Sequence, residues 1–390
     1  MAGAPAQPGA PRQAGGSRRV LIAGGGTGGH LFPGMAIADA LRAQDPTTTV
    51  RFAGSAHGLE HTAIPARGDH LYRIRVRGLY GIRGPRRWLA LALLPLAFLQ
   101  SLWVLLRFRP HLVLGVGGYA SGPVLLMALL ARPLLRCRCA IQEQNAAPGM
   151  TNRLLGRWVQ RSYLANHDSA GHFRHPVVLG NPVRQPILAL RGEEGAPAPS
   201  PTPSPAPSPE PVTLLVFGGS QGARVLNTAM CEALPRLAAA PFPLRIIHQT
   251  GRADHATVRE AYVAQAGGLA WEAHPFIDDM AGAYTAAHLV LARAGASTVS
   301  ELIAARKAAV LVPIPGSSGN HQLRNAEGLA NAGCAVLLPQ AELSGERLAT
   351  ELLALLADHA RLAQMAAATD ALFNGDSAAR IAADALQWMG

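Results

Sequence analysis

The sequence lacks several features that would place it in common classes of protein. Lys307 is its only lysine, and none of its four cysteines forms a CxxC pair. This spacing argues against a zinc ribbon and a disulfide framework, and the cysteine usage suits a reducing compartment. Residues 1–17 contain no apolar core, so we expect a disordered tail there and not a signal peptide.

Acidic side chains are missing from one long stretch. Between Asp69 and Glu143 there are eleven arginines and no acidic residue. Coding bias explains arginine in place of lysine, but it does not explain the missing acids. Such a positive field attracts phosphate on nucleic acid, lipid headgroups or a nucleotide. No recognised nucleic-acid motif accompanies the arginines, which alternate with apolar residues more than with aromatic ones, so we expect no nucleic-acid partner.

One apolar run, WLALALLPLAFLQSLWVLLR at 88–107, is barely long enough to cross a bilayer. Three interpretations stay open: a membrane span, an ordinary buried helix, and a helix whose exposed apolar face lies in a membrane surface. A basic rim favours the third, with residues 73–109 facing an anionic membrane. The rim consists of Arg73, Arg75, Arg77, Arg83, Arg86, Arg87, Arg107 and Arg109.

Short apolar runs alternate with helix-compatible stretches along the 390 residues, a length that predicts two domains. The pattern predicts an α/β protein with two Rossmann-like parallel-sheet domains facing each other. A Pro-rich segment at 196–209 reads as a flexible insert near their junction. The expected strands are 19–23, 49–53, 111–116, 138–142 and 161–165, then 212–217, 244–248, 270–276, 288–292, 308–312 and 334–338.

The stretch GGGTGGH at 24–30 follows the first expected strand with G-x-G-x-x-G spacing. Missing side chains would let the main chain approach a phosphate at the sheet edge, and we expect Pro33 in the first turn of the next helix. A nicotinamide cofactor would need an acidic residue at the end of the second strand. TVRFAGS at 49–55 has none, which argues against NAD.

Two further glycine clusters follow expected strands, at 115–123 and 218–223. Three such clusters, divided between the two halves, predict a ligand-lined cleft between the domains. In the third cluster, Ser220 and neighbouring N–H groups would meet an anion at a helix start.

Two later segments add polar groups. In RAGASTVSELIA at 293–304, Ser297 is placed to cap a helix. Glu301 could accept two ribose hydroxyls, or could be an acid favoured by the helix dipole. The loop at 312–326 enters a helix through side chains that suit sugar hydroxyls, namely His321, Gln322 and Asn325.

Taken in order, GGGTGGHLFPGMAIA, GVGGYASGP, QEQNAAPGMTN, GNPVR, GGSQGARVLN, FIDDM, RAGASTVSEL and HQLRNA resemble the MurG family. These are UDP-GlcNAc:lipid-linked muramyl-pentapeptide N-acetylglucosaminyltransferases of bacterial cell-wall synthesis, and the resemblance covers about residues 18–388. It implies a GT-B fold, peripheral attachment to the cytoplasmic face of the inner membrane, and roles in cell shape and division.

The resemblance also implies a division of the chain. An acceptor-binding, membrane-associating domain would span 18–183, and a junction with the Pro-rich insert would span 184–211. A UDP-GlcNAc-binding domain would span 212–370, and a helix within 371–390 would pack back on the N-terminal domain. The insert is longer than the family pattern, and GSAHGLE at 54–60 is a variant of it.

By the same resemblance, Ser220 and Arg184 would hold the donor diphosphate, the Ile277 backbone the uracil, and Glu301 the ribose. Gln322 would contact GlcNAc hydroxyls. The remaining donor contacts would be Thr27, Gly28, Gly29, Asn145, Ala296, Ser297, Thr298, Val299 and Ser300. The diphosphate of the lipid acceptor would meet Gly25, Gly26, Gly117, Gly118 and Tyr119.

The implied reaction is attack of the muramyl 4-hydroxyl on C1 of UDP-α-GlcNAc, with inversion. A general base should assist the weak alcohol nucleophile. His30 is the first candidate, because imidazole titrates near neutrality, and Glu143 is the second. For His30, a purely orienting hydrogen bond is the alternative.

We expect no cofactor and no catalytic metal. The adjacent acids Asp278 and Asp279 fall beside the expected uracil site and not the diphosphate, so Arg184 and helix N-terminal amides would stabilise the leaving UDP. Two other classes remain open: a GT-B enzyme acting on diacylglycerol, a sterol or a soluble acceptor, and a non-enzymatic membrane- or nucleic-acid-binding module, for which nucleic acid is the poorer match.

Overall fold

The computed structural model describes residues 17–76, 84, 88, 92–192, 211–317 and 320–390. The expected N-terminal tail (apart from Ser17), the Pro-rich segment at 196–209, and four arginines of the expected basic rim lie outside the described residues. These four are Arg77, Arg83, Arg86 and Arg87.

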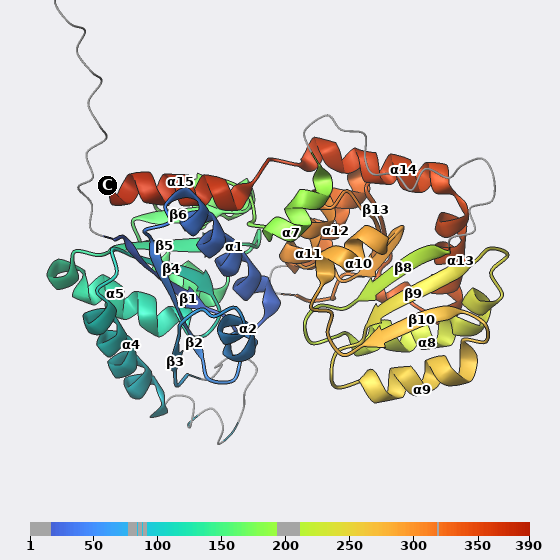
Figure 1. The fold of residues 1–390 in the computed structure, drawn as a ribbon, viewed down its shortest axis with the longest axis horizontal. Helices are drawn as coiled ribbons and strands as arrows, with labels where there is room; N and C mark the ends of the chain where they lie inside the picture. Colours follow the sequence, from blue (N-terminus) through green and yellow to red (C-terminus); the bar gives the residue numbers. More distant parts are fainter. Residues whose placement is uncertain (1–16, 77–83, 85–87, 89–91, 193–210, 318–319) are drawn as a thin grey trace, which may run out of the picture.

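The N-terminal half is built on a seven-stranded, fully parallel sheet in the order β3-β2-β1-β4-β5-β6-β7 (Figure 1). Its strands are β1 Arg19–Gly24, β2 Thr49–Ser55, β3 Leu71–Ile74, β4 Leu112–Gly117, β5 Arg138–Glu143, β6 Arg161–Leu164 and β7 Pro176–Val178. The connecting helices are α1 Gly28–Gln44, α2 Glu60–Ala66, α4 Leu94–Phe108, α5 Ser121–Leu135, α6 Met150–Leu155 and η1 His167–His172.

The second half repeats this plan with a six-stranded parallel sheet in the order β10-β9-β8-β11-β12-β13. Its strands are β8 Val212–Phe217, β9 Leu244–Gln249, β10 Ala270–His274, β11 Leu289–Ala292, β12 Ala308–Leu311 and β13 Ala335–Leu337. Its helices are α8 Arg224–Ala238, α9 His255–Gln265, α10 Met280–Ala286, α11 Ala296–Ala304, α12 His321–Asn331, η4 Gln340–Glu342, α13 Gly345–Ala357, α14 His359–Ala368 and η5 Thr369–Leu372. Between the two sheets lie α7 Gln185–Leu188 and η2 Ala189–Arg191.

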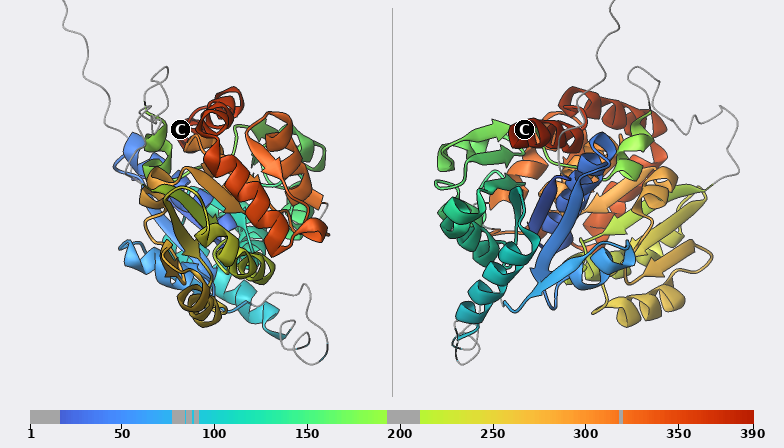
Figure 2. Two further views of the ribbon diagram at one scale, coloured as in Figure 1. Left: turned by 90° about the vertical axis from the view of Figure 1, so that its right-hand side faces the viewer. Right: turned by 60° about the vertical axis from the view of Figure 1, so that its left-hand side comes forward.

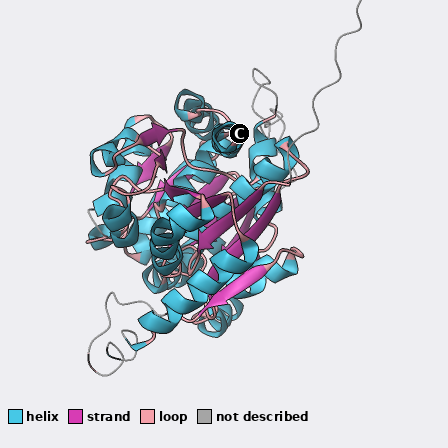
Figure 3. Cartoon of the chain, turned by 90° about the vertical axis from the view of Figure 1, so that its left-hand side faces the viewer, coloured by secondary structure: helices cyan, strands magenta, loops and turns pink. Residues whose placement is uncertain are grey.

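Helices cover both faces of each sheet, as Figure 3 shows for the N-terminal half. The central strands are apolar on both faces for this reason: Leu21 and Ile22 of β1 point into different core clusters, and both are essentially fully buried. The expected parallel α/β architecture is thus confirmed. Every expected strand is present, whereas the short edge strands β3 and β7 were not anticipated.

The last helix, α15 Ser377–Met389, lies on the N-terminal half beside α1 (Figures 1 and 2). Ala378, Ile381 and Ala385 are buried in the same core cluster as the apolar face of α1. At β6, Asp384 accepts hydrogen bonds from Arg161 and from the Tyr163 hydroxyl, the latter at 2.8 Å. The C-terminal segment therefore ties the two sheets together.

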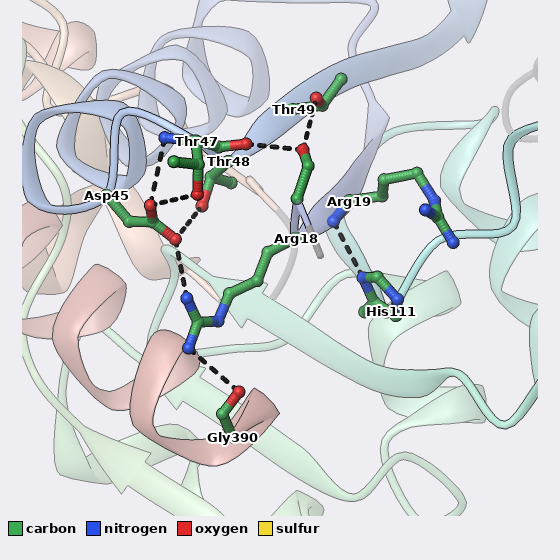
Figure 4. Close-up of polar contacts among 9 residues, drawn as sticks. Arg18, Arg19, Asp45, Thr47, Thr48, Thr49, His111 and Gly390 are labelled. Carbon is green, nitrogen blue, oxygen red and sulfur yellow. Dashed lines mark hydrogen bonds and ion pairs between the residues drawn. The ribbon is translucent and has the colours of Figure 1, made fainter. Parts of the chain in front are cut away.

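The end of the chain is held at the amino edge of β1 (Figure 4). The Arg18 guanidinium donates to the Gly390 carbonyl at 3.0 Å and to the Asp45 carboxylate at 2.8 Å. Hydrogen bonds from Thr47, Thr48 and Arg18 hold the pKa of Asp45 at about 2, against the opposing effect of burial. This polar cluster lies at the edge opposite to the glycine loops, so it stabilises the fold without lining the site.

Two expectations about helix starts are wrong. Helix α1 begins at Gly28, so Pro33 is its sixth residue and does not lie in the first turn. A proline there removes the N–H that would bond to the carbonyl of Gly29. Ser297 does not cap α11, because Gly295 is the N-cap and Ser297 is the second helical residue. The two deviations are connected, since the Ser297 hydroxyl donates to the Gly29 carbonyl at 3.2 Å.

Candidate functional site

A cleft of about 490 Å³ lies between the two halves. It is bounded by the loop after β1 and the start of α1 on one side, and by the loops after β8 and β9 and the first turns of α11 and α12 on the other. Fourteen of the expected site residues line it: Thr27, Gly28, Gly29, His30, Asn145, Arg184, Ser220, Ile277, Ala296, Ser297, Thr298, Glu301, His321 and Gln322.

The other expected residues lie elsewhere. Val299 and Ser300 line a separate cavity of about 220 Å³ behind α11. Six further expected residues do not line the main cleft either. They are Glu143, Gly25, Gly26, Gly117, Gly118 and Tyr119.

The glycines of the two N-terminal loops pack the loops against each other. A Cβ on Gly118 would lie 2.1 Å from the Gly25 carbonyl oxygen, and one on Gly24 would lie 2.4 Å from the Gly117 carbonyl oxygen. The Gly25 N–H also donates to Gly117, at 3.3 Å. At these positions the missing side chains permit close contact between backbones, so packing already accounts for them without a ligand.

A buried carboxylate, Glu60, fixes the tip of the first loop. It accepts from Gly26 N–H at 2.6 Å, and from the N–H and hydroxyl of Ser55 at 2.8 and 2.7 Å. Its side chain also fills the space that a Cβ on Gly25 would need. An acceptor diphosphate would therefore compete with Glu60 for the Gly26 amide, whereas Thr27 and Gly29 are exposed toward the cleft.

The two sides of the cleft touch at the start of α1. Besides the bond between Ser297 and Gly29, the Gly28 N–H lies 3.5 Å from the Ser220 hydroxyl. The first N–H groups of a helix have no intrahelical acceptor and favour an anion. Ser220 and the amino end of α1 thus face one point in the cleft from opposite sides.

Arg184 and Glu301 form the charged floor of the cleft. The Arg184 guanidinium donates to Glu301 at 2.9 Å and stacks over the Phe32 ring at 4.1 Å. Tyr284 donates its hydroxyl to the other carboxylate oxygen of Glu301 at 3.2 Å. Burial, and next the Glu301 charge, raise the pKa of Tyr284 well above its usual value. The Arg184 Nε is buried and has no hydrogen-bond partner among the described residues.

His30 is half-buried where the cleft meets β4. Its ring occupies the place of the missing Gly117 side chain, with Nδ1 only 2.6 Å from where a Cβ would stand. The same nitrogen is 3.1 Å from Oε1 of Gln144. His30 therefore combines access to the cleft with a fixed ring position, which a general base requires.

Glu143 has a different environment. One carboxylate oxygen accepts from the backbone and side-chain amides of Asn145, at 3.0 and 3.1 Å. The other accepts from Gly149 N–H at 3.1 Å and from Asn152 at 2.9 Å. The residue is 1% exposed. Four donors to one buried carboxylate shape the loop that presents Asn145 to the cleft.

On the C-terminal side of the cleft, two residues expected to contact the nucleotide sugar already have hydrogen-bond partners within the protein. The Ile277 N–H donates to Oε1 of Gln249 at 2.8 Å, and Gln322 accepts from the Ile314 N–H at 3.0 Å. Sequence reasoning missed several lining residues, although all of them except Gln249 stood inside a quoted motif. They are Phe32, Gln144, Gln249, Phe276, Met280 and Arg293.

Asp279, one of the two adjacent acids, caps α10 by accepting from Gly282 N–H at 2.9 Å. Within the described ranges, no three His, Cys, Asp or Glu side chains gather as a metal-binding group. Within the same ranges, no helix has the length and apolarity to cross a membrane.

Comparisons with known proteins agree with this geometry. The glycosyltransferase family 28 N-terminal domain matches residues 20–164, and the glycosyltransferase family 28 C-terminal domain matches residues 213–383. A protein of Anaeromyxobacter dehalogenans (strain 2CP-C) is 44% identical over 370 residues, covering 93% of this chain and 91% of that protein. It is named UDP-N-acetylglucosamine--N-acetylmuramyl-(pentapeptide) pyrophosphoryl-undecaprenol N-acetylglucosamine transferase.

A protein of Syntrophus aciditrophicus (strain SB) with the same name is 42% identical, covering 86% of this chain and 88% of that protein. Among solved structures, MurG of Acinetobacter baumannii superimposes with a TM-score of 0.68 at 29% identity, covering 95% of this chain and 99% of that one. The calicheamicin glycosyltransferase CalG4 shares the fold alone, with a TM-score of 0.60 at 16% identity over 96% of this chain and 98% of its own. The two parallel sheets thus form a GT-B fold, and the chain belongs to the MurG family of glycosyltransferases.

Proposed function

We propose that the chain transfers GlcNAc from UDP-GlcNAc to the 4-hydroxyl of a lipid-linked N-acetylmuramyl-pentapeptide, with inversion at C1. The observation that carries this proposal is the cleft itself. It brings His30 and the amino end of α1 opposite Ser220, Glu301 and the start of α11. One side offers a base and an anion-favouring helix end, and the other offers a hydroxyl and a carboxylate for a nucleotide sugar.

In this mechanism the donor lies on the C-terminal side. Arg184 and Ser220, which both line the cleft, bind the diphosphate, the former through charge-assisted hydrogen bonds. Glu301 accepts hydrogen bonds from the ribose, and the backbone of Ile277 meets the uracil. Because Ile277 N–H is bonded to Gln249, nucleotide binding involves a shift of the Gln249 side chain.

His30 takes the proton of the acceptor hydroxyl as it attacks C1, a contribution of about 10²–10⁴-fold to rate. Charge that develops on the leaving UDP is stabilised by Arg184 and the N–H groups of Gly28 and Gly29. These fixed donors act without a divalent metal. Turnover that persists in excess EDTA supports this part of the proposal, and abolition contradicts it.

The decisive experiment incubates the protein with radiolabelled UDP-GlcNAc and the lipid-linked muramyl-pentapeptide, and follows label into the lipid phase. We expect transfer by the wild type and a fall of at least about 10²-fold for His30→Ala, with UDP-GlcNAc affinity nearly unchanged. Label in diacylglycerol, a sterol or a soluble acceptor, and none in the muramyl lipid, would replace this proposal with another GT-B activity.

We propose further that the acceptor is reached from a membrane surface through α4 and α5, which pack side by side. One face of α4 is buried and the other exposes Leu99, Trp103 and Leu106. On α5, Leu130 and Leu134 are exposed at 64% and 76%. Arginines flank this surface, and Arg107 stacks on Trp103 at 5.9 Å. An apolar patch with a basic rim suits an anionic bilayer on the cytoplasmic side.

Flotation with vesicles that contain anionic lipid tests this surface. Leu134→Asp should weaken binding clearly, because it places a charge in the apolar patch. Val263→Asp on α9 is the matched control, since Val263 is 72% exposed but lies in the C-terminal half. Equal flotation of the two variants would remove α5 from the membrane surface.

A further inference from the structure

We infer that Gln144 is a positioning residue that holds the His30 ring in one tautomer, with the proton on Nδ1 and the free electron pair on Nε2. The inference deepens the proposed function. The expected effect on turnover rests on that function. The tautomer itself follows from hydrogen-bond geometry and can be measured without any substrate.

The argument starts from a backbone carbonyl. The Gln144 side-chain nitrogen lies 2.9 Å from the carbonyl oxygen of Val116. A carbonyl oxygen can only accept, so the group facing it is the NH₂ of the amide. Its second N–H donates to Oε1 of Gln142. In the opposite orientation, the amide oxygen of Gln144 would face the carbonyl oxygen of Val116. Such a contact is costly here because Gln144 is buried, with 3% of its surface exposed.

The orientation of the amide decides the protonation of His30. With both N–H groups engaged, Gln144 presents Oε1 to the His30 ring, at 3.1 Å from Nδ1. An amide oxygen has no proton to give, so Nδ1 must carry the hydrogen. In the neutral ring Nε2 is then the acceptor nitrogen, at the opposite side of the ring from Gln144. A general base needs this form.

Beyond Gln144 the hydrogen bonds continue, and each residue donates to the next one along the chain of bonds. Gln142 donates to Asn181 at 3.3 Å, and Asn181 donates to the Ser300 hydroxyl of α11 at 3.2 Å. Ser300 in turn donates to the Ala296 carbonyl at 2.9 Å. Aligned donors polarise one another, which strengthens each bond of the chain.

The chain of hydrogen bonds therefore leads from His30, through the buried ends of β5 and the segment after β7, to the first turn of α11. Gln142 and Asn181 are 0% and 7% exposed. Because α11 lines the donor side of the cleft, the same buried amides that fix the tautomer also connect the two halves.

The test is ¹⁵N NMR of protein labelled at histidine, at alkaline pH where imidazole is neutral, with the His30 signals assigned by their loss in His30→Ala. We expect an N–H type resonance for Nδ1 and an unprotonated type for Nε2. The proton on Nε2 in the wild type would overturn the inference. This measurement stands even if a Gln144 variant fails to fold.

Gln144→Met keeps the side-chain length and removes the amide. We expect the tautomer population to shift toward Nε2–H, with a fall in kcat of about tenfold or more and little change in the KM for UDP-GlcNAc. Gln160→Met is the matched control, because the Gln160 side chain also hydrogen-bonds to the backbone of the sheet, by accepting from Cys139 N–H, but does not contact His30. An unchanged His30 tautomer in a folded Gln144→Met variant would contradict the inference.

The same spectra separate this inference from the proposed function. Nδ1–H in a protein that transfers no GlcNAc would support the positioning role and reject the function. Transfer of GlcNAc by a protein whose His30 carries its proton on Nε2 would support the function and reject the positioning role.

Discussion

Replacement of Glu143 by glutamine separates two roles for this carboxylate. If Glu143 holds its loop in place, the change harms the fold. An NH₂ group replaces one oxygen, and both oxygens accept a backbone N–H and an Asn amide. In either orientation of the new amide, two donors to the buried carboxylate therefore lose their acceptor.

Each lost acceptor costs about 1–3 kcal/mol at a buried site. Glu143→Gln should then lower the free energy of unfolding of the N-terminal half by roughly 2–6 kcal/mol. A domain of this size loses about 2–4 °C in Tm per kcal/mol, so we expect a fall on the order of 10 °C. Differential scanning calorimetry measures it directly.

Glu346→Gln is the control for the substitution itself. Glu346 also accepts a hydrogen bond, in its case from Arg236 at 2.6 Å, but its side chain is 73% exposed. An exposed ion pair is worth about 1 kcal/mol or less, so its Tm should barely move. Glu143→Gln with an unchanged Tm and a loss of turnover of about 10²-fold or more would refute the anchoring role and favour a general base.

Three further changes test other parts of the structure. Gly117→Ala should displace the His30 ring and lower kcat, with UDP affinity retained by calorimetry. Gly333→Ala, also at positive φ but in open space away from the cleft, should leave kcat unchanged. Burial lowers the pKa of His248 to about 3. Below about pH 6.5 the unfolded chain therefore binds a proton at this histidine that the folded chain does not bind. The free energy of unfolding then falls by up to about 1.4 kcal/mol per pH unit between pH 6.5 and 3. Urea titrations should give a shallower pH dependence for His248→Gln, and an equal one contradicts this assignment. Asp384→Ala removes the polar contacts between α15 and β6, so hydrogen exchange should rise along α15; unchanged exchange would mean that apolar packing alone holds the helix.

The glycine loops illustrate how far sequence reasoning reached. The spacing at 24–29 predicted a turn between a strand and a helix, and the structure has β1 and α1 there. It could not tell why each glycine is needed. Gly118 makes room for Gly25, and Gly117 makes room for His30, because residues about ninety positions apart meet at one sheet edge.

Pro33 and Ser297 show the same limit. Local rules place proline in a first turn and serine at a helix N-cap. In the structure both serve a contact between the two halves, since the carbonyl freed by Pro33 at Gly29 accepts the Ser297 hydroxyl. The helix-start preferences of proline and serine were overridden by a hydrogen bond between two segments that are far apart in the sequence.

The sequence by itself determined all the strands except the edge strands β3 and β7, the order of the glycine-rich turns and the family, because these depend on periodicity and on motifs read along the chain. Tertiary structure alone decided which polar groups are free to act. Glu60 engages one loop amide, Glu143 is surrounded by donors, and Gln144 faces His30. Hydrogen-bond partners in a buried site come from separate strands, so only the folded chain assigns them.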